Sequence, residues 1–182
     1  LGYHFNPIEV KPRYTESKEL LVEILAFSLM PNHYHFMLRQ KANDGISLFM
    51  KKLGNGYTGY FNKKYKRTGS LFQGVYKYAL IKKESHFIHL PYYIHLNPLD
   101  MFIPTWRTRE KQIDNHEAVS VLNNYRWSSH LDYSGRENFP LVTKRDFLTK
   151  FFDGTNNYLK GVRQWLAQPK LEAIEHITLE SL

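Results

Sequence analysis

The sequence contains no cysteine, which excludes disulfide bonds and thiolate metal ligands. It also lacks an apolar run close to the roughly 18 residues that a membrane-spanning helix requires. Its longest candidate, residues 24–30, is better explained as a buried strand. With 42% hydrophobic and 23% charged residues, the composition is typical of a soluble globular domain. We therefore expect a cytoplasmic protein in which any metal ion is bound by histidine, carboxylate, amide or water.

Acidic residues are scarce in the middle of the chain. Between Lys41 and Lys83 the only acidic residue is Asp44, whereas ten residues are basic: Lys41, Lys51, Lys52, Lys63, Lys64, Lys66, Arg67, Lys77, Lys82 and Lys83. The formal charge of the whole chain is +8, and a local block of this kind attracts a polyanion such as nucleic acid. The alternative is a solvated basic surface without a partner, and charge alone leaves both open.

Hydrophobic periodicity predicts a strand pair followed by a long helix. Residues 25–29 and 33–39 are apolar and aromatic and flank a turn-like break at residues 30–32, which favours two antiparallel strands. Over residues 46–61 the apolar side chains recur at steps of three and four, the spacing of an amphipathic helix. Residues 71–81 are rich in aromatics and are expected to form a strand or an extended segment.

A second helix is predicted to run from Ser85, as its cap, toward Leu96. Pro91 lies inside this helix and should kink or break it, and Pro98 should end it because the residue before a proline is pushed out of the helical region. Weaker patterns predict short helices in the C-terminal part of the chain, over residues 117–125, 144–152 and 158–166.

Two pairs of residues have spacings that suit chemistry. His33 and His35 would project from the same face of a strand, a suitable arrangement for two ligands of one metal ion. Tyr93 and Asn97 would share one face of a helix, and an amide oxygen can coordinate a hard cation. Each pair also has an ordinary explanation, as surface or hydrogen-bonded histidines and as a tyrosine packed in the core.

The segment from Gly69 to Lys77 combines glycine, amide, aromatic and lysine side chains in close succession. Aromatic rings can stack on bases and lysines can contact phosphates, so this composition suits nucleic-acid binding. A solvated hairpin with one aromatic face in the core explains the same composition equally well.

Four short motifs occur in an order that resembles the REP-associated tyrosine transposases, which are single-tyrosine HUH transposases of bacterial insertion sequences. The motifs are LMPNHYH at residues 29–35, GSLFQG at 69–74, YIHLNP at 93–98 and WSS at 127–129. The resemblance extends from about Glu19 to about Tyr133. It rests on the joint occurrence of the motifs, because each one alone is short.

The resemblance implies an α+β fold. An antiparallel sheet with helices packed on it is expected, similar to the ferredoxin or RNA-recognition-motif layout, with the strand of the histidine pair in a central position. The transposase domain would occupy residues 1–133, with its N-terminal strand missing from the chain, and residues 134–182 would form a mostly helical C-terminal extension.

The resemblance also implies a transposase or endonuclease that cleaves and rejoins single-stranded, hairpin-bearing DNA through a covalent 5′-phosphotyrosine. Tyr93 falls on the nucleophile, and His33, His35 and Asn97 fall on the ligands of a divalent cation, Mg²⁺ or Mn²⁺. Contacts to DNA are expected from Lys51, Lys52, Lys63, Lys64, Arg67, Gln73, Tyr76 and Lys77. Such a protein would be associated with the nucleoid, as a monomer or a homodimer.

Two positions depart from the family pattern, and two other functions stay open. Val75 stands where the family often has arginine, so one DNA contact is either lost or supplied by Lys77, and Pro91 precedes the nucleophile by two residues. One alternative is a non-catalytic or domesticated DNA-binding protein of the same fold. The other is a metal-dependent hydrolase that uses water, which needs a carboxylate base near the histidines, and only Glu23 and Asp44 lie close in sequence.

Overall fold

The computed structural model describes residues 19–108, 114–175 and 177–178. Its sheet consists of strands β1 (Val22–Leu29) and β2 (Tyr34–Gln40), which pair antiparallel. The strand pair predicted from residues 25–29 and 33–39 is therefore confirmed. A hydrogen bond of 2.8 Å from the Met30 N–H to the His33 carbonyl closes the turn between the strands and fixes where the histidine motif begins.

The motif at residues 127–129 lies beside β1. The Leu29 N–H donates to the Trp127 carbonyl at 2.8 Å, and the Phe27 N–H donates to the Ser129 hydroxyl at the same distance. Ser128 forms an isolated antiparallel bridge with Ser28. The motif therefore satisfies backbone groups of β1 that β2 does not reach, which is a structural role.

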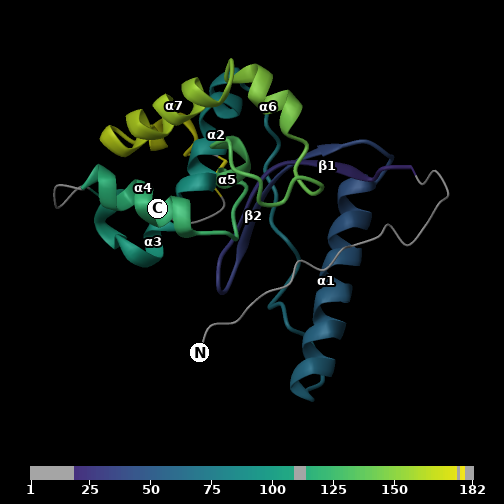
Figure 1. Ribbon diagram of the computed structural model, residues 1–182. Helices are drawn as coiled ribbons and strands as arrows, with labels where there is room; N and C mark the ends of the chain where they lie inside the picture. Colours follow the sequence, from purple (N-terminus) through teal and green to yellow (C-terminus); the bar gives the residue numbers. More distant parts are fainter. Residues whose placement is uncertain (1–18, 109–113, 176, 179–182) are drawn as a thin grey trace.

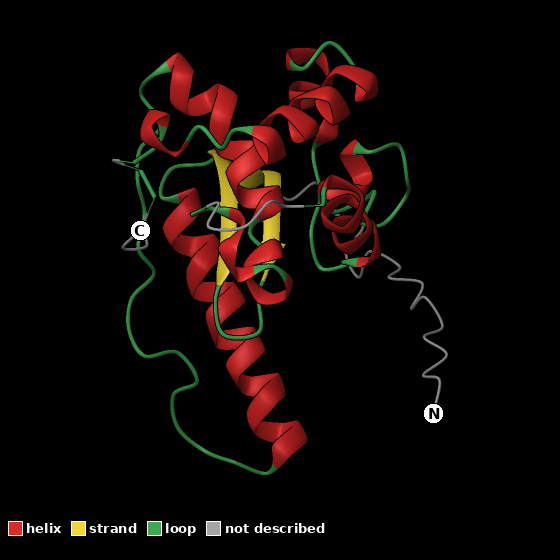
Figure 2. Cartoon of the chain, turned by 90° about the vertical axis from the view of Figure 1, so that its left-hand side faces the viewer, coloured by secondary structure: helices red, strands yellow, loops and turns green. Residues whose placement is uncertain are grey.

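Helix α1 (Gly45–Tyr65) projects away from the rest of the molecule (Figures 1 and 2). It confirms the amphipathic helix predicted over residues 46–61. The chain then returns beside α1, because the Asn62 amide donates to the Gly69 carbonyl at 2.9 Å and the Tyr76 hydroxyl lies 3.2 Å from the Ser47 hydroxyl. Residues 71–81 contain no strand, so of the two forms expected there the extended segment is the one observed.

Helix α2 (Glu84–Leu96) packs against both strands and passes through Pro91 without a break. A proline inside a helix removes one backbone hydrogen bond and costs about 3 kcal/mol. Here residues 91–96 are all buried, and that burial outweighs the local cost. The predicted break is therefore wrong. The cap is also wrong, because Lys83 and not Ser85 precedes the first helical residue.

The remaining elements are short and mostly helical. They are α3 (Leu99–Phe102), the 3₁₀ turn η1 (Pro104–Trp106), α4 (Asn115–Asn124), α5 (His130–Tyr133), α6 (Arg145–Phe151), α7 (Thr155–Ala167) and the 3₁₀ turn η2 (Leu171–Ala173). Helices α4, α6 and α7 confirm the three helices predicted in this part of the chain. The architecture is thus an antiparallel sheet with packed helices and a mostly helical C-terminal part, the α+β class that was expected.

The C-terminal helices share one hydrophobic core with the sheet and α2. The Tyr92 ring of α2 stacks on Tyr158 of α7, with ring centroids 5.7 Å apart and planes 10° apart. Gly161 of α7 lies against the Tyr92 ring so closely that a Cβ atom there would come within 2.1 Å of the Tyr92 hydroxyl. The C-terminal part is therefore packed onto the N-terminal part through contacts of α7 and η2 with α2. None of the helices described here has the length and apolarity to cross a bilayer.

Candidate nucleophile site and nucleic-acid interface

The two histidines of the LMPNHYH motif lie side by side at the start of β2. His33 directly precedes the strand and is exposed, while His35 lies within it and is half-buried. Their ring centroids are 5.1 Å apart with the planes at 86°. The His33 Nδ1 lies 2.7 Å from the Asn32 side-chain oxygen, which can only accept, so Nδ1 carries the proton and Nε2 the lone pair. This orientation suits a metal-binding imidazole.

Helix α2 brings Tyr93 to this pair. The Tyr93 ring centroid lies 5.8 Å from that of His35, with the planes at 79°. Tyr93 is 1% exposed and belongs to the core cluster between the sheet and the helices. The helix thus positions a phenol beside the imidazoles, as the motif order predicted, but it also buries that phenol.

Asn97 follows α2 and is held on both sides of its amide. Its Nδ2 donates to the Tyr93 carbonyl at 3.0 Å, and its Oδ1 accepts from Arg107 Nη2 at 2.7 Å. The side chain is fully buried. The two histidines therefore fit a metal ion, whereas the Asn97 oxygen is engaged by a cation of the protein itself and does not fit as a third ligand in this arrangement.

Arg107 is the residue of this site that sequence reasoning missed. Its guanidinium carbon lies 4.8 Å from the Tyr93 ring centroid, and the tyrosine contributes to the electrostatic environment of the arginine. Two further hydrogen bonds reach both oxygens of Asp100, from Nε at 2.9 Å and from Nη2 at 2.6 Å. Burial opposes the charge, but the bonds to Tyr93 and Asp100 outweigh it, so the pKa of Arg107 is raised above its ordinary value.

No motif pointed to Arg107, because it follows Tyr93 by fourteen residues and lies outside all four motifs. The available signal was the pair Trp106 and Arg107 after Asp100. The Trp106 side chain is fully buried, and its Nε1 donates to the same Asp100 carboxylate at 2.5 Å. The fold thus fixes the arginine through a buried aromatic neighbour and a shared carboxylate.

A buried polar network continues along α2. His95 Nε2 lies 2.7 Å from the Ser129 hydroxyl, and its Nδ1 lies 2.8 Å from the Tyr158 hydroxyl, which in turn lies 2.7 Å from His130 Nδ1. Burial, with the nearby His130, holds the pKa of His95 well below its ordinary value. Burial, with the charge of Arg136, lowers the pKa of His130 to about 4. Both imidazoles are therefore neutral at neutral pH.

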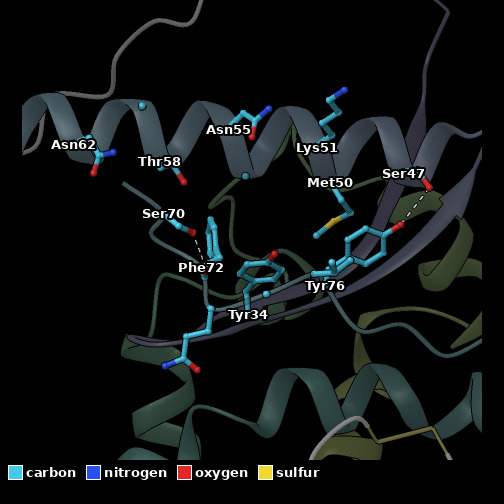
Figure 3. Close-up of a pocket in the computed structure, with 15 residues that line it drawn as sticks. Tyr34, Ser47, Met50, Lys51, Asn55, Thr58, Asn62, Ser70, Phe72 and Tyr76 are labelled. Atoms are coloured by element: carbon cyan, nitrogen blue, oxygen red, sulfur yellow. Dashed lines mark hydrogen bonds between the residues drawn. The ribbon is translucent and has the colours of Figure 1, made fainter. Parts of the chain in front are cut away.

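A groove runs between α1 and the returning chain, the segment of residues 70–76 that follows this helix and lies beside it (Figure 3). It has a volume of about 880 Å³. Tyr34 and Phe72 meet edge to face in it with ring centroids 6.0 Å apart, and Tyr76 faces α1 (Figure 3). Lys51 and Gln73 also line it. Aromatic faces, amides and one lysine along an open groove are the side chains that bind unpaired nucleotides.

Comparison with known proteins gives one result for this chain. Residues 12–97 match the family of IS200-like transposases. The match covers a little under half of the chain and includes His33, His35, Tyr93 and Asn97. It supports the transposase family for this part of the protein, and with it DNA as the partner. No curated protein and no solved structure matched.

The transposase-like segment holds all eight residues from which DNA contacts were predicted. Lys51, Lys52, Lys63 and Lys64 are exposed along α1. Gln73 and Tyr76 belong to the returning chain, which Lys77 directly follows, and Tyr76 is half-buried against α1. Arg67 also makes contacts within the protein. Its Nη2 donates to the Ser70 carbonyl at 3.1 Å, and its guanidinium carbon lies 5.7 Å from the Phe61 ring centroid.

The described residues contain no group of three or more histidine or carboxylate side chains placed to hold a metal ion. Glu23, one of the two acidic residues close in sequence to the histidines, forms an ion pair with Arg39. A hydrolase that activates water through a carboxylate base beside the histidine pair therefore gains no support from this part of the chain.

Proposed function

We propose that the protein is a single-tyrosine HUH transposase or endonuclease, of the REP-associated type, that cleaves and rejoins single-stranded, hairpin-bearing DNA. The observation that carries the proposal is the Tyr93 ring 5.8 Å from His35, within the segment similar to IS200-like transposases. The phenol and the imidazole pair belong to one chain, so the proposed reaction does not need a second copy of the protein to supply the tyrosine.

The reaction is an exchange of phosphate esters. The Tyr93 oxygen attacks the scissile phosphorus, the bond from phosphorus to the 3′ oxygen breaks, and the products are a 5′-phosphotyrosine and a free 3′-hydroxyl. The phenol proton passes to water, and the leaving 3′ oxygen takes one up. The 3′-hydroxyl of the same or another strand reverses the step. The ester energy is kept in the covalent bond, so rejoining needs no nucleotide triphosphate.

His33 and His35 are the proposed ligands of a divalent cation, Mg²⁺ or Mn²⁺. Such an ion supplies a Lewis acid that draws charge from the phosphate. The protein's own part is to orient the imidazoles through the Asn32 bond to His33 and to hold Tyr93 against His35. Asn97 can join the proposed ligand set only if its side-chain oxygen gives up the hydrogen bond from Arg107 and binds the metal ion instead.

The groove beside α1 is the proposed DNA-binding surface. The exposed lysines of α1 meet phosphates without reading sequence, and the aromatic and amide side chains of the groove contact unpaired bases. This division of contacts suits a DNA hairpin with a single-stranded arm, because the duplex stem offers phosphates and the arm offers bases.

A second candidate function, a DNA-binding protein without catalysis, is favoured by one observation. Tyr93 is 1% exposed, so its oxygen meets a phosphate only after a neighbouring side chain moves. In a non-catalytic protein Tyr93 is simply a core residue, and the groove and basic helix serve binding alone.

The two functions are separated by trapping the covalent complex. Purified protein is incubated with end-labelled hairpins from the flanks of its own gene and with Mn²⁺ or Mg²⁺, and the products are run on a denaturing gel. The proposal predicts a labelled protein band that requires the metal ion and is absent in Tyr93→Phe. Tyr92→Phe, one position earlier on the same helix, is the matched control and keeps the band. Binding without any band in the wild type supports the non-catalytic function.

A further inference from the structure

Arg107 contacts Tyr93 and is the more exposed of the two side chains. The Arg107 side chain is 14% exposed, whereas Tyr93 is 1% exposed, so solvent reaches the arginine more readily than the tyrosine. The guanidinium is also in contact with the phenol, because its carbon lies 4.8 Å from the centroid of the Tyr93 ring. Any anion that reaches the Tyr93 oxygen therefore does so beside Arg107.

We propose that Arg107 is a catalytic residue that binds the scissile phosphodiester and positions it for attack by the Tyr93 oxygen. This inference rests on the proposed tyrosine chemistry. A planar guanidinium with several donors matches two oxygens of a phosphate, which a lysine does not. When the phosphate takes the donors now directed at Tyr93 and Asn97, both side chains are released at the moment the substrate arrives.

Asp100 sets the direction in which the guanidinium points. It binds Nε and Nη2 of Arg107 through both carboxylate oxygens, and it is itself fixed by Trp106 Nε1. An arginine held by two bonds on one edge keeps the other edge for a ligand, and it loses little conformational freedom when that ligand binds. Asp100 is therefore a positioning residue for Arg107.

During attack the Tyr93 oxygen bonds to phosphorus while the bond to the 3′ oxygen breaks, and negative charge spreads over the non-bridging oxygens. The same charge collects on the Tyr93 oxygen when the step is reversed. A preorganised cation beside these atoms stabilises that charge, and removal of one such donor from an enzyme lowers the rate by about 10²–10³-fold. Replacement of Arg107 should therefore slow cleavage and rejoining to a similar extent.

The test compares Arg107→Gln, Arg107→Lys and Arg107→Ala with the wild type and with Arg163→Gln, an exposed arginine of α7. Three quantities are measured for each: the rate of adduct formation at saturating hairpin, the hairpin dissociation constant, and the melting temperature. We expect Arg107→Gln to form adduct about 10²–10³-fold more slowly with nearly unchanged hairpin affinity. Arg107→Lys should be intermediate, and added guanidinium at millimolar concentration should restore part of the rate of Arg107→Ala.

Failures of the two proposals are distinct. If the wild type forms adduct and Tyr93→Phe does not, but Arg107→Gln matches the wild type, the role of Arg107 is overturned and the tyrosine chemistry stands. A rate that falls only in step with the melting temperature, without rescue by guanidinium and without recovery in Arg107→Lys, assigns Arg107 to folding and overturns its role in the reaction. Absence of adduct in the wild type overturns both proposals.

Discussion

Single side chains in the core of this protein carry both the proposed chemistry and a liability to acid. Tyr93, Asn97 and Arg107 form one connected group, and His95, Tyr158 and His130 form another along the same helix. The first group is charged through its arginine, which a carboxylate balances. The second is uncharged, because burial keeps both imidazoles in their neutral form.

Acid should therefore unfold the protein earlier than its carboxylates alone require. The pKa of His130 is about 4 in the folded state and near 6.5 when unfolded. Its stabilising contribution is complete above pH 6.5, falls as the pH drops below that value, and is lost by about pH 4. The shift corresponds to up to about 3 kcal/mol, and the low pKa of His95 acts in the same direction.

Urea unfolding between pH 7.5 and 4.5 measures this effect. The free energy of unfolding should decline through the interval, and the decline should be smaller in His130→Gln. His116→Gln, at an exposed histidine of α4, is the control and should follow the wild type. An equal decline in the wild type and in His130→Gln would remove the buried imidazole as the cause.

Among the elements, α2 connects the sheet with the C-terminal helices, because it contacts both strands, α7 and η2. It contacts the sheet on one side and α7 on another, and it carries Tyr93 toward β2. The close approach of α7 depends on Gly161, where a side chain has no room against Tyr92. The position of the phenol thus depends on packing with a part of the chain far away in sequence.

Gly161→Ala should accordingly destabilise the protein. Extra atoms in a close-packed interior typically cost about 1–3 kcal/mol, and here the added Cβ atom meets the Tyr92 ring. Gly56→Ala in α1 is the matched control, because the structure has nothing within 4 Å of a Cβ atom at that position. The control should be neutral or stabilising by about 0.5–1 kcal/mol. Equal melting temperatures for the wild type and Gly161→Ala would contradict the packing argument.

The elements that sequence predicted were those with a strong local signal. The strand pair follows from apolar and aromatic segments on both sides of a turn, and α1 follows from apolar steps of three and four. The resemblance singled out Tyr93 and His35, and the structure brings their rings together. Pro91 misled the prediction because the local cost of a proline was weighed without the burial of the helix that contains it. Arg107 was missed because its partners Tyr93 and Asp100 come together only through the turn after α2.

For the whole molecule the uneven charge is the dominant feature. Exposed lysines occur along α1, a helix that projects from the body (Figure 1), and one of them, Lys51, lines the groove (Figure 3). A surface of this shape can contact a polyanion along its length, whereas Tyr93, the proposed nucleophile, lies in the core. Affinity for DNA and reactivity toward it should therefore be separable by substitution.

Binding of hairpin DNA should weaken steeply with salt. Each phosphate contact contributes about 0.7–0.9 to the slope of log affinity against log salt concentration. Replacement of Lys51, Lys52, Lys63 and Lys64 by glutamine should lower that slope by about 0.7–0.9 for each of these lysines that contacts a phosphate, and should reduce affinity at low salt. The matched control replaces four basic residues of the C-terminal part, Lys150, Lys160, Arg163 and Lys170, and should keep the wild-type slope. Equal slopes in both quadruple variants would place the DNA elsewhere.

Mapping of the adduct decides whether Tyr93 becomes esterified to DNA. The wild type is incubated with the cleaved hairpin and divalent metal, the DNA is digested to a nucleotide remnant, and tryptic peptides are analysed by tandem mass spectrometry. The peptide covering residues 84–107 contains both Tyr92 and Tyr93, which fragmentation distinguishes. The proposed 5′-phosphotyrosine predicts a nucleotide joined through its 5′ phosphate to Tyr93. Cleaved DNA with an unmodified peptide, or a nucleotide on Tyr92 or any other side chain, would contradict it.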